Sequence, residues 1–150
     1  MPATIRNILA VICGLGVGMA LNMAVIELKS SVLFPAPVGA DLNDAAQLKA
    51  YVATLPSAAF LVVMVAHLGQ AFVGGWVAAR VGASRPMLLA MIVGAVTLAG
   101  GLLMMMEIRG PTWFAVELPL YLVVAWLAGS IERRRRAALT PTEPPPSPST

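Results

Sequence analysis

The chain has 150 residues, of which 59% are hydrophobic and only 11% are charged. This composition leaves too little polar surface for a water-soluble globule and predicts an integral membrane protein. The formal net charge of +3 does not indicate nucleic-acid binding, because the basic residues gather at the ends of apolar segments and form no stripe with interleaved aromatics. The single cysteine, Cys13, excludes an intrachain disulfide and a cysteine-based zinc site.

Four apolar segments follow one another along the chain, each with about the 17 to 25 residues that cross a ~30 Å hydrocarbon core. They cover residues 8–28, 57–79, 87–106 and 114–131. We therefore expect an all-α fold, an integral membrane four-helix bundle in residues 1–131, with a long loop at residues 29–56.

The basic residues sort to alternate sides of these segments. Seven of the ten fall on the side of the N-terminus, namely Arg6, Arg80, Arg85, Arg133, Arg134, Arg135 and Arg136. The other three are Lys29, Lys49 and Arg109. Because cytoplasmic loops carry an excess of Lys and Arg, this pattern predicts that both termini are cytoplasmic and that the loop at 29–56 is external.

The first segment has a second interpretation as a cleaved signal peptide. Arg6 precedes it, and Gly18-Met19-Ala20 offers small residues at the two positions that a signal peptidase requires. The apolar stretch continues past Ala20 to Ile26, which favours an uncut span.

The external loop predicts an extended stretch around Pro35 and Pro37, followed by a short amphipathic helix at about residues 44–55. Asp44 and Gln47 form a plausible capping pair for that helix. One apolar face, which could lie on the outer membrane surface or cover the bundle, consists of Leu48, Tyr51, Val52 and Leu55.

Residues 132–150 begin with a basic run and continue as a stretch rich in Pro, Ser and Thr, which predicts a disordered cytoplasmic tail. The basic run consists of Arg133, Arg134, Arg135 and Arg136. These arginines can stop translocation and can also contact anionic lipid headgroups, and the two roles are compatible.

Small residues predict where the helices pack. Gly14 and Gly18 form a Gly-x-x-x-Gly pair in the first span, Gly74 lies in the second, and Gly94 and Gly101 lie in the third. We expect a core seam that joins the first three spans.

Four polar residues inside the spans are candidates for an intramembrane site: Asn22, His67, Gln70 and Glu117. His67 lies near the middle of the second span, where an ionisable group is a functional candidate. It can also bridge helices as a neutral side chain, bonded to Asn22 or to a backbone carbonyl. Glu117 is open to two interpretations, as a group facing the bundle beside Pro119 or as an interfacial carboxylate like Glu27 and Glu107.

A Cu(I) site is conceivable, since Met19, Met23, Met104, Met105 and Met106 lie in the outer halves of two spans and His67 could join them. Flexible packing is the commoner role of methionine. We expect no metal, no cofactor and no enzymatic activity, because the chain has no Gly-rich phosphate loop, no Ser-His-acid grouping and no second histidine for haem.

Several short stretches together resemble a family of small uncharacterised bacterial membrane proteins. They are Phe34-Pro35-Ala36-Pro37-Val38-Gly39, Ala66-His67-Leu68-Gly69, Gly74-Gly75-Trp76 and Pro111-Thr112-Trp113-Phe114. The resemblance covers about residues 7–131 and implies four helices in the inner membrane. That family has no established activity to carry over to this chain.

Two classes of function remain. The first is a non-enzymatic, polytopic membrane protein that acts by helix association, as a homo-oligomer or as an accessory subunit of a membrane complex. The alternative is a minimal transporter or channel with a polar path around Asn22, His67, Gln70 and Glu117.

Overall fold

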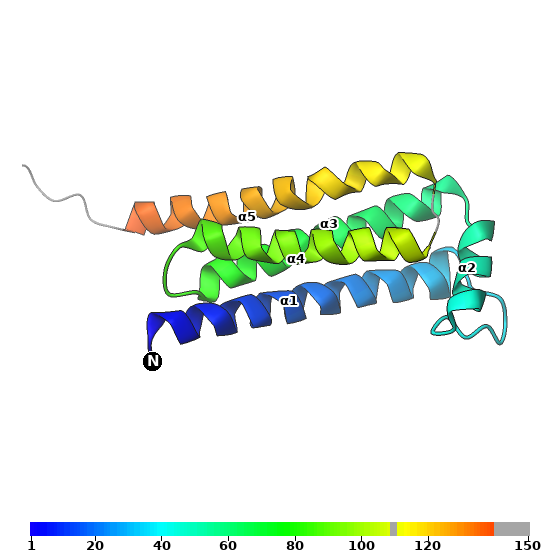
Figure 1. The fold of residues 1–150 in the computed structure, drawn as a ribbon, viewed down its shortest axis with the longest axis horizontal. Helices are drawn as coiled ribbons and strands as arrows, with labels where there is room; N and C mark the ends of the chain where they lie inside the picture. The colour runs from blue at the N-terminus through cyan, green and yellow to red at the C-terminus, as the bar shows by residue number, and fades with distance from the viewer. Residues whose placement is uncertain (109–110, 140–150) are drawn as a thin grey trace, which may run out of the picture.

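The computed structural model describes residues 1–108 and 111–139, and within these ranges the chain is helical and has no β-strand (Figure 1). The elements are α1 (Ala3–Leu28), the π-helical turn η1 (Lys29–Leu33), α2 (Ala45–Thr54), α3 (Ser57–Val81), α4 (Pro86–Glu107), the 3-10 turn η2 (Thr112–Val116) and α5 (Glu117–Leu139). The segments Ala3–Leu33, Ser57–Val81, Pro86–Glu107 and Thr112–Leu139 are each long and apolar enough to cross a membrane. The predicted all-α fold with four membrane-length helices is confirmed. Arg109 and residues 140–150 of the tail predicted at 132–150 lie outside the described residues.

Helix α3 is the centre of the bundle, because it packs against α1, α4 and α5. Helices α4 and α5 also pack on each other, whereas α1 and α4 have little contact. Figure 1 shows the four long helices side by side, with α2 across the end at which α1 finishes and α3 begins. The fold is therefore a three-helix unit of α3, α4 and α5, with α1 added along α3.

Glycines allow the backbones of α1 and α3 to touch. A Cβ atom on Gly18 would lie 2.6 Å from the carbonyl oxygen of Gln70, and one on Gly74 would lie 2.7 Å from the carbonyl oxygen of Gly14. Lipid provides no hydrophobic drive for helix association, so this close approach has to supply the packing energy between the two helices.

The third span packs differently from the sequence-based expectation. A Cβ atom on Gly94 would collide with Ala125, and one on Gly101 would lie 2.9 Å from the hydroxyl of Tyr121. Both glycines therefore pack against α5. A core seam of the first three spans is present, formed by Ala10, Ala78, Leu89 and Val93, but Gly94 and Gly101 lie outside it. The cause of this difference is that α4 has small residues on more than one side, including the exposed Gly100, and hydropathy does not tell the sides apart in an apolar solvent.

The segment between α1 and α3 folds over one end of the bundle. The Asp44 carboxylate accepts a hydrogen bond of 2.9 Å from the backbone N–H of Gln47 and caps α2. Tyr51 is the buried residue of α2 and donates its hydroxyl proton to the carbonyl of Phe34. The ammonium of Lys29 lies 4.9 Å from the centre of the Tyr51 ring, which gives this lysine a cation–π contact although only 5% of its surface is exposed.

The turn that joins α3 to α4 lies at the other end and anchors the start of α1. The Asn7 amide oxygen accepts hydrogen bonds from the backbone N–H groups of Ala83, at 2.8 Å, and Ser84, at 3.3 Å. The Arg6 side chain donates to the carbonyl of Val81 at 2.9 Å. These bonds fix α1 against the end of α3.

Candidate functional site

Two of the four predicted polar residues meet between α3 and α5. The Nδ1 atom of His67 lies 3.3 Å and 3.2 Å from the two carboxylate oxygens of Glu117. A hydrogen bond at this distance needs a proton on one of the two partners, either on Nδ1 or on the carboxyl group. The contact therefore joins the two helices through one shared proton.

Tyr121 completes the site one helical turn after Glu117. Its hydroxyl donates to a Glu117 oxygen at 3.2 Å, and its ring centre lies 6.4 Å from that of His67. Gly101 of α4 makes room for the Tyr121 ring. We call His67, Glu117 and Tyr121 the polar cluster.

The polar cluster is almost closed to the surroundings. Glu117 and Tyr121 are each 1% exposed, while the His67 side chain is 21% exposed. Phe114 lies beside it with its ring centre 6.4 Å from that of His67, and it packs edge-on against Phe60 at 5.6 Å. In such an apolar environment each hydrogen bond is stronger than in water, and an unpaired polar group is more costly.

Local chain chemistry explains how Glu117 reaches this place. The 3-10 turn η2 leads into α5, and Glu117 is the first residue of that helix. Pro119 lies in the first turn of α5, where the missing N–H group is tolerated. Of its two interpretations, the structure places Glu117 inside the bundle rather than at the interface.

The other two predicted polar residues do not join the cluster. Gln70 packs against Gly18, and its Cγ atom would lie 3.2 Å from a Cβ atom there. Asn22 is 7% exposed, and within the described part of the chain its amide oxygen has no hydrogen-bond partner. The predicted bridge from His67 to Asn22 is replaced by the bridge from His67 to Glu117.

The sequence-based search missed Tyr121 and the aromatic residues around the site. Tyr121 follows Glu117 at i+4, the spacing at which helical side chains meet, so a signal for it was present. Phe60 and Phe114 had no such signal, because their contact joins two different spans.

Metal ligands do not gather at the polar cluster. Across residues 1–108 and 111–139 there is no group of three or more His, Cys, Asp or Glu side chains that could hold a metal ion. Four of the methionines considered for Cu(I) have exposed side chains, namely Met19, Met23, Met104 and Met106.

A second set of charges lies at the end of the bundle where α5 finishes. Glu132 is fully buried and accepts hydrogen bonds from Arg135, at 2.7 and 2.8 Å, and from Arg136, at 3.0 Å. The Arg136 guanidinium also donates to the carbonyl of Gly82 in the α3–α4 turn, at 2.8 Å. Two of the four arginines predicted to contact lipid headgroups are thus engaged within the chain, while Arg133 and Arg134 are exposed.

The same contacts explain why α5 is longer than the predicted span. The sequence placed the end of the span at Ile131 and a separate tail from residue 132, whereas α5 continues to Leu139. Arg135 and Arg136 lie at i+3 and i+4 from Glu132, where ion pairs support a helix.

Together, the four membrane-length helices and the polar groups enclosed between them define a helical, multi-pass membrane protein. Comparisons with protein-family models, curated proteins and solved structures found no match to this chain. Its function therefore has to be argued from its own geometry.

Proposed function

We propose that the chain is a non-enzymatic membrane protein that acts by helix association, as a homo-oligomer or as an accessory subunit. The observation that supports this is a stripe of small, exposed residues on α1, made of Gly16, Ala20 and Ala24. At 3.6 residues per turn, this stripe lies on the side of α1 opposite to Gly14 and Gly18. We call it the outer stripe.

The residues of the outer stripe are spaced four apart, like Gly14 and Gly18, but no helix of the bundle covers them. Gly14 and Gly18 have no room for a side chain because α3 lies against them, whereas a Cβ atom on Gly16 would meet nothing within 4 Å. Small residues four apart let the backbone of another helix approach closely in a membrane. The outer stripe is suited to a second helix, supplied by another copy or by a larger complex.

The test is the substitution Gly16→Leu, measured on the purified full chain in lipid nanodiscs and mild detergent. The added side chain leaves the fold of one copy intact and blocks close approach of a partner helix, so the oligomer or the co-purifying subunit should be lost. Gly100→Leu is the matched control, because Gly100 is also an exposed helical glycine with nothing within 4 Å of its Cβ position. If the wild type is monomeric and without a stoichiometric subunit, or if Gly16→Leu associates as the wild type does, the proposal fails.

The proposed location is the bacterial inner membrane, with both termini in the cytoplasm and α2 at the outer surface. Support comes from the clustering of charge: Arg6, Arg80 and Arg136 all contact residues near the α3–α4 turn or the end of α5, at one end of the bundle. Lys29 lies at the other end, beside α2. A membrane-impermeant thiol reagent should label a cysteine placed at Ser84 only after the cells are opened, and labelling of intact cells would reverse the orientation.

The polar cluster favours a second candidate function, a minimal transporter or channel. An ionisable pair inside the membrane is a functional candidate by default, and the proton shared by His67 and Glu117 is the kind of group that proton-coupled transport uses. Asn22 and Gln70 lie outside the cluster, so no continuous polar path joins the four residues. Flux in proteoliposomes that depends on pH and is abolished by His67→Ala, with Gln70→Ala unaffected, would favour this candidate over association.

A further inference from the structure

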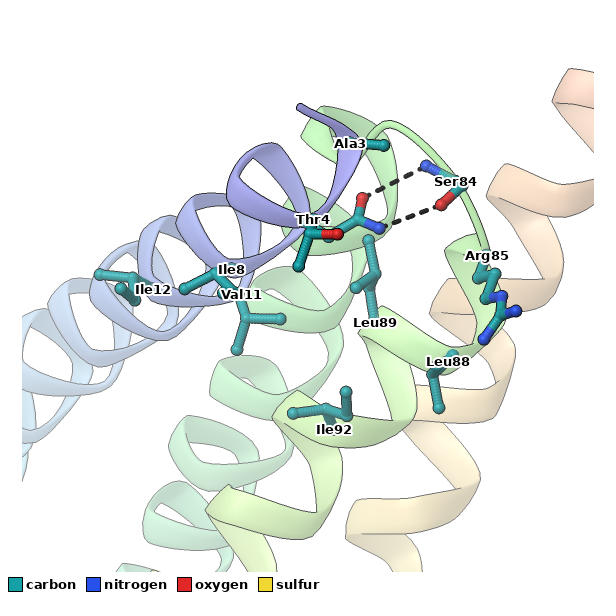
Figure 2. Close-up of a pocket in the computed structure, with 11 residues that line it drawn as sticks. Ala3, Thr4, Ile8, Val11, Ile12, Ser84, Arg85, Leu88, Leu89 and Ile92 are labelled. Carbon is teal, nitrogen blue, oxygen red and sulfur yellow. Dashed lines mark hydrogen bonds between the residues drawn. The ribbon is translucent and has the colours of Figure 1, made fainter. Parts of the chain in front are cut away.

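A groove opens between the first turns of α1 and α4, where these two helices have little contact (Figure 2). Its volume of about 620 Å³ falls in the ~300–1,000 Å³ range of ligand sites in proteins. Asn7 holds the start of α1 against the α3–α4 turn, and α1 then follows α3, so the space beside α4 remains unfilled.

The lining of the groove changes from polar to apolar along its length. Thr4, Ser84 and Arg85 stand at the end of the groove, where both helices begin, as Figure 2 shows. Farther along the two helices the walls are apolar, made of Ile8, Val11, Ile12, Leu88, Leu89 and Ile92. A groove with a polar mouth and an apolar body has the polarity of a phospholipid that stands with its headgroup at the membrane surface.

The mouth of the groove is electropositive and rich in donors. Among the described residues, Arg85 is the only charged one that lines the groove, and no carboxylate does. Within the described residues the Arg85 guanidinium makes no hydrogen bond or ion pair, in contrast to Arg6, Arg80 and Arg136 at the same end. A guanidinium binds a phosphate through two parallel hydrogen bonds, and the Thr4 and Ser84 hydroxyls can add further donors.

We propose that this groove is a binding site for one anionic phospholipid, with its phosphate on Arg85 and an acyl chain between α1 and α4. This site differs from a general attraction between the basic end of the bundle and anionic lipid. The phosphate is bound by one guanidinium, and the acyl chain is held between the walls formed by α1 and α4. It is independent of the outer stripe, which lies on a different part of α1.

Native mass spectrometry of the detergent-purified chain tests the site, with phosphatidylglycerol and phosphatidylcholine of identical acyl chains as probes. The wild type should retain one phosphatidylglycerol with at least about fivefold higher affinity than phosphatidylcholine, the preference that one basic residue gives at an anionic surface. Arg85→Gln should remove this preference, and Arg85→Lys should restore part of it. Arg134→Gln is the matched control, since Arg134 is an exposed cation near the end of α5 and outside the groove.

The apolar part is tested by Ile92→Trp, which fills the groove and should lower the affinity for both lipids, with circular dichroism checking that the helices remain. If Arg85→Gln and Arg134→Gln lose the same amount of preference for phosphatidylglycerol, the preference comes from surface charge in general, and the proposal is overturned. Undiminished phosphatidylglycerol binding by Ile92→Trp would also overturn it. So would a lipid-free dimer that Ile92→Trp dissociates, because the groove would then belong to a second copy.

Discussion

Replacing Glu117 by Leu is expected to destabilise the bundle by removing the acceptor at the centre of the polar cluster. The carboxylate is 1% exposed, and it bonds to His67 at 3.2 Å and to the Tyr121 hydroxyl at 3.2 Å. Leucine has no acceptor, so a buried phenolic O–H and a largely buried ring nitrogen would lose their partner without access to bulk water.

The expected loss of unfolding free energy in Glu117→Leu follows from the number of hydrogen bonds removed. An interhelical side-chain hydrogen bond such as His67–Glu117 contributes on average ~0.6 and at most ~1.7 kcal/mol in membrane proteins. The Tyr121–Glu117 bond lies within α5 and adds the ~0.5–1.5 kcal/mol of an ordinary hydrogen bond, so the loss of both corresponds to about 1–3 kcal/mol. Glu117→Gln keeps an oxygen that accepts from Tyr121 and adds an N–H group that can donate to Nδ1 of a neutral His67. We therefore expect Glu117→Gln to lower the free energy of unfolding by less than about 1 kcal/mol.

The assay is a reversible unfolding titration in mixed micelles, arranged as a double-mutant cycle of His67→Leu and Glu117→Leu. The coupling energy between the two positions should be about 0.6–1.7 kcal/mol. Glu107→Leu is the control: this exposed carboxylate of α4 should change the unfolding free energy by no more than about 0.5 kcal/mol. If the losses of unfolding free energy in His67→Leu and Glu117→Leu sum to that of the double variant within about 0.5 kcal/mol, the reasoning is refuted. The two side chains would then be neighbours that do not stabilise each other.

Three further predictions concern buried polar groups. Asn22→Leu should leave the unfolding free energy unchanged or raise it, because its buried amide oxygen has no partner in the described residues; a loss above about 1 kcal/mol would contradict this. Glu132→Gln should cost about 1–3 kcal/mol, because Arg135 loses the charge of its partner, and hydrogen exchange of the amides at the end of α5 should accelerate; unchanged exchange would argue against the ion pairs. Asn7→Ala should cost about 1–3 kcal/mol, because the Ala83 N–H loses its acceptor, and exchange in the first turn of α1 should accelerate while that in α2 stays the same.

Hydropathy was sufficient to predict the four spans, because the bilayer sets the same length requirement for each of them. It predicted their ends less well. The fourth apolar segment ends at Ile131, where the charged residues begin, whereas Glu132 forms ion pairs with two arginines of its own helix and α5 continues. Pairs of opposite charge at i+3 and i+4 are visible in the sequence, so this error was avoidable.

The faces of the helices could not be predicted in the same way. In water the buried side of a helix is the apolar side, but in lipid both sides are apolar, and α1 and α4 carry small residues on more than one side. The register between α1 and α3 could not be predicted from the sequence either. Gly18 lies opposite Gln70 and Gly14 lies opposite Gly74. This register brings Asn22 level with Ala66 rather than beside the ring of His67. His67 and Glu117 were recognised singly because an ionisable residue within a span is rare, but their pairing depends on the relative depth of α3 and α5.

The distribution of polar groups bears on which helix carries the function. The polar cluster joins α3 to α5, and the bonds of Glu132 and Arg136 join the end of α5 to the α3–α4 turn, so the unit of α3, α4 and α5 satisfies its strongest polar groups internally. Helix α1 contributes no residue to these networks and packs mainly on α3. It borders the open groove and presents the outer stripe, two features that the bundle itself does not use. If the protein acts by association, α1 is therefore the helix whose exposed side should respond to substitution, while substitutions in the polar cluster should affect stability first.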